Sequence, residues 1–214
     1  MTNKKGYPVT APILTPEVRL SFAQHIMVPE EKKKMNSDET YNQWSASLLM
    51  PKDSNLDLIK DTIKQAILDA WPDPADRPRK FNAVLKDGDS GDHKKDGVPQ
   101  SEKYEGYINH MYLDAISYKQ PGIVHKNNVR VPLTNPDDVY SGCYGIAQIA
   151  FQAYRNASGC GVRTLLLNFM KTRDGEPLMG GGSKPKPEDA FAEFASEDAE
   201  RAPSAAFEDM DGLF

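Results

Sequence analysis

The chain has 214 residues, which is enough for one good core with extensions but too few for two full domains. No apolar run approaches the roughly 20 residues that span a bilayer, and the two cysteines form no CxxC pair, so we expect a protein of the reducing cytoplasm without a membrane partner. A net charge of −5 spread evenly over the surface would exclude a nucleic-acid partner, so the distribution of the charge along the chain decides between function classes.

The first half of the chain predicts two strands and a helix. Residues 17–22 and 44–50 alternate apolar with polar side chains, and the charged stretch over 29–43 between them is expected to be an exposed loop. Asn55 can cap a helix that begins near Leu56, because apolar residues then recur at three- and four-residue spacings as far as Ala70. Two prolines, at positions 72 and 74, end this helix.

The second half predicts an irregular excursion followed by strands. Residues 73–100 are rich in Pro, Gly, Asp and Lys and offer little to bury. A strand over 107–119 ends in turn residues. Residues 141–154 alternate, with apolar side chains on one face and Tyr144 and Tyr154 on the other. This strand is expected to form a hairpin with residues 161–172.

These elements predict a mainly β fold with one or two helices. About five strands, one helix between the second and third, and a closing hairpin match an OB-like five-stranded barrel over residues 1–179. The same set of elements fits other small barrels, and a fold does not by itself fix a function.

The composition changes after residue 173. Between Glu188 and Phe214 nine carboxylates accompany a single arginine, a net charge of −8, which leaves +3 for residues 1–187. We therefore expect residues 180–214 to be a disordered acidic tail joined to a mildly basic body. The end of the tail combines acidic with apolar side chains, which suits a basic pocket on a partner protein. The residues concerned are Asp209, Asp211, Leu213 and Phe214.

Aromatic residues next to cations mark a candidate binding site on the body. Binding single strands without sequence preference needs cations that follow phosphates and flat rings on which unpaired bases stack. Both kinds of side chain occur in or beside the predicted strands. The DNA-binding candidates are Trp44, Tyr118, Lys119, Tyr144, Tyr154, Arg155, Lys171 and Arg173. Each has a structural alternative, because aromatic residues in strands more often belong to the core and most surface cations are merely solvated.

No motif predicts a catalytic site or a cofactor. Asp87, Asp89 and Asp92 lie in a run that resembles a metal loop, but an EF-hand would need a carboxylate where Val98 stands. The histidines lack zinc spacing, and neither a phosphate-cradling loop nor a nucleophile elbow occurs. We therefore expect a non-enzymatic protein. One alternative is a metal-dependent nuclease at the three aspartates, and another is an adaptor that acts through its tail and binds no DNA.

Several segments together resemble a family of bacteriophage single-stranded DNA-binding proteins. In order they are PEVRLSF, LLMPKD, RPRKF, KQPGIV, VYSGCYGIAQIAFQAY and KTRDGEPL, within about residues 14–179. VYSGCYG with the following FQAY is the most distinctive, and the loop over 86–103 does not match the pattern.

The resemblance implies an OB-fold replication protein of the host bacterial cytoplasm. Such a protein would coat single-stranded DNA cooperatively and without sequence preference in phage replication, recombination and repair. Its acidic tail would recruit replication proteins such as a polymerase, helicase or primase. The oligomeric state stays open, and no motif carries over particular DNA-contact residues.

Overall fold

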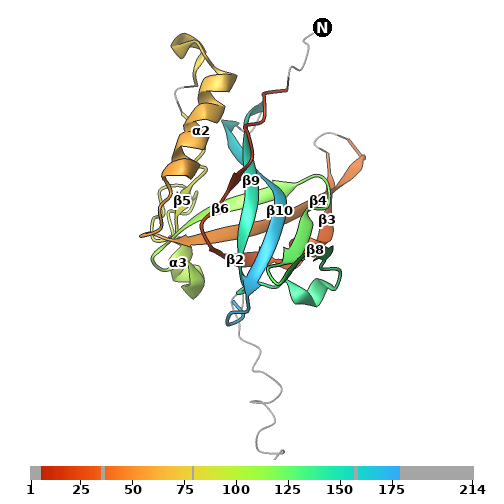
Figure 1. The fold of residues 1–214 in the computed structure, drawn as a ribbon. Helices are drawn as coiled ribbons and strands as arrows, with labels where there is room; N and C mark the ends of the chain where they lie inside the picture. The colour runs from red at the N-terminus through yellow and green to blue at the C-terminus, as the bar shows by residue number, and fades with distance from the viewer. Residues whose placement is uncertain (1–5, 35–36, 79, 157–158, 179–214) are drawn as a thin grey trace, which may run out of the picture. The chain divides into compact units, whose positions relative to one another are not determined.

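Five strands close into a barrel in the computed structural model, which describes residues 6–34, 37–78, 80–156 and 159–178. The ring runs through β2 (Val18–Ala23), β4 (Thr40–Pro51), β6 (His110–Ser117), β10 (Gly159–Arg173) and β9 (Tyr144–Asn156), and β9 pairs again with β2 (Figure 1). Strands β6 and β10 are parallel, and the other neighbours are antiparallel. The predicted mainly β barrel is confirmed.

Alternation along the strands separates the barrel interior from its outer face. On β4, Ala46 and Leu48 are buried in the core, and on β9 Ile149 and Phe151 are fully buried. The two-faced pattern predicted for residues 141–154 is therefore confirmed, with Tyr154 on the partly exposed side.

Shorter strands extend the sheet beyond the ring. β1 (Ile13–Leu14) pairs with β9, β5 (Lys86–Asp87) pairs with β6, and β7 (Gly122–His125) pairs with β10 and with β8 (Asn128–Pro132). β1 and β5 have two residues each, and strands so short show no periodicity in the sequence.

The exposed loop predicted over residues 29–43 is wrong. β3 (Val28–Lys33) pairs with the first residues of β4, which runs longer than the predicted strand 44–50. Most side chains of this hairpin are exposed or half-buried, so no apolar alternation marks it in the sequence. Its cations have local partners, as in the 3.8 Å ion pair between Lys33 and Asp38.

The predicted helix is confirmed as α2 (Asp57–Ala70). Asn55 Oδ1 accepts a hydrogen bond from the Asp57 backbone N–H at 3.0 Å, and Ile59 and Ala66 are buried. The helix packs against β9 and β10 (Figure 1). The remaining helices α1 (Gln24–Met27) and α3 (Gln100–Lys103), with the short 3-10 turns at 74–76, 105–107 and 136–138, are one turn long each.

The excursion after α2 is irregular, as predicted, but it is fixed to the barrel. Trp71 and Phe81 pack edge to face with ring centroids 5.5 Å apart. Next to them, the Asn82 backbone N–H donates to the Cys160 carbonyl at 2.9 Å. The segment after residue 80 is thereby held alongside β10, where it forms one wall of the site described below.

The chain divides into two units, Met1–Met179 and Gly180–Phe214. The predicted acidic tail, with Asp209, Asp211, Leu213 and Phe214, lies outside the described residues. Within the described part of the chain, no helix has the length and apolar character needed to cross a membrane.

Candidate nucleic-acid interface

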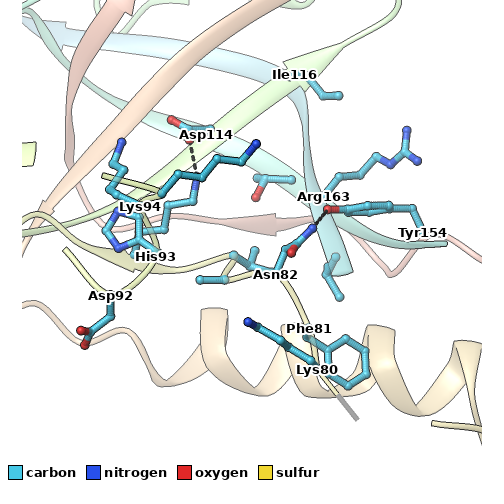
Figure 2. Close-up of a pocket in the computed structure, with 16 residues that line it drawn as sticks. Lys80, Phe81, Asn82, Asp92, His93, Lys94, Asp114, Ile116, Tyr154 and Arg163 are labelled. Atoms are coloured by element: carbon cyan, nitrogen blue, oxygen red, sulfur yellow. Dashed lines mark hydrogen bonds and ion pairs between the residues drawn. The ribbon is translucent and has the colours of Figure 1, made fainter. Parts of the chain in front are cut away.

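A groove of about 840 Å³ lies between the segment 80–95 and the strands β6, β9 and β10 (Figure 2). Five cationic side chains and two carboxylates line it, an excess of three positive charges. The cations are Lys80, Lys86, Lys94, Lys95 and Arg163, and the carboxylates are Asp92 and Asp114. An excess of this sign suits an anionic ligand.

Arg163 on β10 joins the groove to two tyrosine rings. Its Cζ lies 5.1 Å from the centroid of the Tyr154 ring, and its Nη1 donates to the Tyr118 hydroxyl at 3.0 Å. Asn82 Nδ2 donates to the Tyr154 hydroxyl at 2.9 Å (Figure 2). A Cβ at Gly161 would come within 3.1 Å of the Tyr154 hydroxyl oxygen, so the absence of a side chain there lets the ring lie close to β10. Tyr154 is thus held at the wall of the groove.

Tyr118 offers an open ring beyond Arg163. It is 48% exposed, and its ring centroid lies 5.9 Å from that of Tyr41. Tyr118 directly follows β6, and the β4–β6 face corresponds to strands 2 and 3 of an OB barrel, where such folds bind oligonucleotides. The neighbouring Lys119 is exposed as well. Tyr118 therefore adjoins the groove through its contact with Arg163.

Lys94 stands at the other end of the groove. It is half-buried, and burial together with the nearby Lys86 ammonium holds its pKa below the ordinary value. Lys86 Nζ pairs with Asp114 Oδ2 at 2.6 Å, whereas no ion pair of Lys94 is found in the described part of the chain. A half-buried cation beside another cation gains from a bound anion.

Tyr144, at the opposite end of β9 from Tyr154, is already covered. Arg173 Cζ lies 3.4 Å from its ring centroid, and Arg173 Nη2 pairs with Glu17 Oε2 at 2.9 Å. Arg19 approaches the same ring at 5.6 Å and donates to the Glu176 carbonyl at 2.7 Å. We call Glu17, Arg19, Tyr144 and Arg173 the Tyr144 cluster. In this cluster the Tyr144 ring and the Arg173 guanidinium contact each other, and neither residue lines the groove.

Two other predicted residues are not placed as free surface groups. Lys171 is only 8% exposed, and its Nζ lies 2.7 Å from Asp174 Oδ1. Trp44 is half-buried and shares the inward-facing side of β4 with Ala46 and Leu48. The alternation of the two strands directs both side chains toward the interior, and a cation as buried as Lys171 requires a carboxylate partner.

Arg155 is exposed near the far wall of the groove. Its Cζ lies 5.8 Å from the centroid of the buried Trp71 ring, which in turn packs on Phe81. Phe81 lines the groove, whereas Arg155 does not line it and is linked to Phe81 through the Trp71 ring.

The lysines of the groove are not among the predicted DNA-binding residues, although they are visible in the sequence. Four lysines occur within residues 80–95, at positions 80, 86, 94 and 95, but nearby aspartates hide their net effect. Some of those aspartates are neutralised by lysines outside the groove. Asp96 Oδ2, for example, pairs with Lys103 Nζ at 2.6 Å.

The proposed metal loop is occupied by a lysine. Lys52 Nζ lies 2.7 Å from Asp87 Oδ1 and 2.8 Å from Asp89 Oδ2, while Asp92 lines the groove. The hydrogen bonds from Lys52 hold the pKa of Asp89 below its ordinary value. Over the described residues, no group of three or more His, Cys, Asp or Glu side chains could hold a metal ion. Nothing in this arrangement favours the nuclease alternative.

Comparison with known proteins assigns the family. The family model described as "Enterobacter phage Enc34, ssDNA-binding protein" matches residues 11–201. The chain belongs to this family. A curated relative, "Putative protein p50" of Acyrthosiphon pisum secondary endosymbiont phage 1, is 33% identical over 152 residues, which cover 65% of this chain and 74% of the relative. The resemblance stated for residues 14–179 is confirmed.

Solved structures share the fold. The single-stranded DNA-binding protein from bacteriophage Enc34 in complex with ssDNA is 22% identical with a TM-score of 0.57, and the match covers 78% of this chain and 88% of that one. The single-stranded DNA-binding protein gp2.5 encoded by bacteriophage T7 is 14% identical with a TM-score of 0.52, over 91% and 98% of the two chains. The predicted OB-like fold of this chain is therefore confirmed.

Proposed function

We propose that this Enc34 family member binds single-stranded DNA along a path that runs from the rings of Tyr41 and Tyr118, past Arg163, into the groove. Bases stack on the open rings, and phosphates follow the cations. The observation that carries the proposal is the position of Arg163, which touches the 48% exposed Tyr118 and also lines a groove with three excess positive charges. The solved Enc34 complex with ssDNA supports the same ligand.

The side chains along this path favour unpaired over paired strands. A ring can stack on a base only when the base is not already stacked and paired within a duplex. Stacking contributes roughly 1–3 kcal/mol per base, and it tolerates any sequence because every base has a flat face. Phosphate contacts add affinity that falls with salt, with a slope of about 0.7 per contact for single strands. The expected activity is sequence-independent coating of exposed strands in phage DNA replication, recombination and repair.

A titration of the full chain with labelled poly-dT at two salt concentrations tests the proposal. We expect tight binding at low salt, a marked loss at high salt, and weaker binding to duplex of equal length. Absence of binding at low salt would refute the proposal and leave the DNA-independent adaptor. Incubation of labelled strands with magnesium or manganese tests the nuclease alternative, and we expect the DNA to remain intact.

We also propose that residues 1–179 form the DNA-binding domain and that residues 180–214 act as a separate acidic arm. A flexible polyanion can compete for a basic groove and is released when DNA arrives. Its last residues would then contact a polymerase, helicase or primase, with the aromatic and acidic groups filling a basic pocket. These contact residues are Asp209, Asp211, Leu213 and Phe214.

Deletion of residues 188–214 separates the two roles of the arm. We expect the shortened chain to bind DNA more tightly and to lose its protein partners. A full-length chain with the nine carboxylates changed to amides should show the tighter DNA binding while keeping Phe214. An unchanged affinity for DNA in both variants would remove the competition model.

A further inference from the structure

His93 lies at the Lys94 end of the groove, and the function proposed above gives it no role. It lines the groove together with Lys94 (Figure 2). Lys86 lines the groove as well. The imidazole is half-buried, and its Nε2 lies 2.7 Å from the Tyr112 hydroxyl. The ring of Tyr112 lies beneath both lysines, whose Nζ atoms are 5.4 Å and 6.0 Å from its centroid. Two ammonium groups and one imidazole thus gather around a single buried phenol.

The charges around His93 oppose its protonation in the free protein. Burial and the ammonium groups of Lys94 and Lys86 hold the pKa of His93 below its ordinary value, and the carboxylates only partly offset them. The groups that face it are Lys86 and Asp87 on β5, Lys94 on its own segment, and Tyr112 and Asp114 on β6.

We propose that Lys86, Lys94 and His93 form a phosphate subsite of the groove, in which the arrival of a nucleotide phosphate is coupled to the uptake of one proton by the imidazole. This inference rests on the proposed binding of single-stranded DNA. Lys86 already pairs with Asp114 at 2.6 Å, so Lys94, which forms no ion pair among the described residues, is the cation that gains most from the phosphate. The negative charge of the phosphate offsets the repulsion from the ammonium groups and favours the imidazolium.

The hydrogen bond to Tyr112 can accommodate both protonation states. Burial raises the pKa of Tyr112, so the phenol stays protonated at neutral pH. A phenol oxygen both donates and accepts. It can donate to Nε2 of a neutral imidazole, and it can accept from Nε2–H once the imidazole is charged. Proton uptake therefore requires no rearrangement of the site.

The coupling predicts that DNA binding tightens as the pH falls. Uptake of one proton makes the affinity rise by up to tenfold for each pH unit, over the range between the pKa of His93 in the free protein and its higher value in the complex. We expect this rise in the full chain with a labelled oligo-dT at constant ionic strength between pH 5.5 and 8.5. The His93→Gln variant should lose most of the pH dependence.

The matched control is Lys95→Gln. Lys95 also lines the groove but does not contact Tyr112, so its loss should weaken binding by a similar factor at every pH and leave the slope intact. A nuclear magnetic resonance titration of the wild-type imidazole needs no variant. The pKa of His93 should rise when oligo-dT binds and should stay low with a methylphosphonate oligonucleotide, which has bases but few charges.

The outcomes separate this inference from the proposed function. Failure of the wild type to bind oligo-dT at low salt would end both. Binding whose pH dependence is the same in wild type and His93→Gln, or an imidazole pKa that oligo-dT leaves unchanged, overturns the subsite alone. A rise of the imidazole pKa with the uncharged analogue would show that the bases, and not the phosphates, act on His93, and it would likewise overturn the subsite.

Discussion

A tyrosine ring and an arginine lie together at each end of β9, but the arginines have different partners at the two ends. Tyr154 lies near one end and Tyr144 at the other, and each ring has an arginine of β10 beside it. At the Tyr144 end, Arg173 also pairs with Glu17. At the Tyr154 end, Arg163 forms no ion pair within the described residues and instead contacts a second, exposed tyrosine. A ring beside a cation is therefore not enough to mark a binding surface.

The two ends differ in whether the arginine already has a carboxylate partner. A guanidinium that already has a carboxylate partner gains little from a phosphate, because the partner must first be displaced. The groove cations lack such compensation overall, with five cations against two carboxylates. Predictions that set one end of β9 against the other therefore test the proposed site directly.

The largest expected difference is between Tyr118→Leu and Tyr144→Leu. Loss of the 48% exposed ring of Tyr118 removes a stacking platform, and DNA affinity should fall roughly fivefold to a hundredfold. Loss of Tyr144, which Arg173 covers at 3.4 Å, should leave affinity within about twofold but lower the free energy of unfolding by about 1 kcal/mol. Fluorescence anisotropy with oligo-dT and urea unfolding measure the two effects.

Tyr118→Phe is the control for the first variant. It keeps the ring and loses only the hydroxyl that accepts from Arg163, so its affinity should stay close to that of the wild type. If Tyr144→Leu impaired DNA binding as much as Tyr118→Leu, the contrast between the ends of β9 would be wrong.

Much of the fold follows from periodicity in the sequence, but the division between the two ends does not. Alternation in residues 141–154 and the helical spacing after Asn55 identify elements correctly because each buries one face. The β3–β4 hairpin buries little, so it leaves no such pattern. Whether a cation has a partner depends on residues far away in the chain, as Glu17 and Arg173 show, and no local spacing reports that.

The candidate site was predictable to a similar degree. Tyr154 lines the groove, and Tyr118 contacts it through Arg163. Lys119 and Arg155 are exposed next to these tyrosines in the chain, whereas Lys171 is paired with a carboxylate. The lysines of residues 80–95 were hidden among aspartates, and only the folded chain shows which of these carboxylates pair with outside lysines and which face the groove.

The next largest effect is expected for a pair of substitutions that removes two positive charges from the groove. Lys80→Gln with Lys95→Gln removes two groove cations, and the slope of log affinity against log salt should become shallower by about 1.4 if both contact phosphates. The matched pair is Lys33→Gln with Lys34→Gln on the β3–β4 hairpin, where Asp38 and Glu39 already neutralise both charges. That control should change the slope far less. Equal changes in both pairs would show that net charge, and not the groove, governs binding.

A smaller effect of opposite sign is expected for Asp92→Asn. Asp92 is one of two carboxylates that line the groove, and its side chain is exposed. Removal of its charge should tighten binding of oligo-dT about twofold to threefold at low salt, with little change at high salt because exposed charges are screened. Asp53→Asn, outside the groove, serves as the control. Weaker binding by the Asp92 variant would indicate that this carboxylate positions a cation.

The smallest expected effect concerns stability at the Tyr144 end. Hydrogen bonds from Arg173 and Thr172 hold the pKa of Glu17 below its ordinary value of 4.5. A carboxylate with a lowered pKa stabilises the folded state above its ordinary pKa, and that contribution is lost as the pH falls through the lowered value.

Glu17 is 41% exposed, so solvent limits the contribution to a few tenths of a kcal/mol. Glu17→Gln should therefore unfold slightly more easily in urea at pH 7, and the difference from wild type should shrink as the pH falls below 4.5. Glu31→Gln, at an exposed position of β3, should show no such convergence. DNA affinity should be the same in both variants, because the Tyr144 cluster does not line the groove.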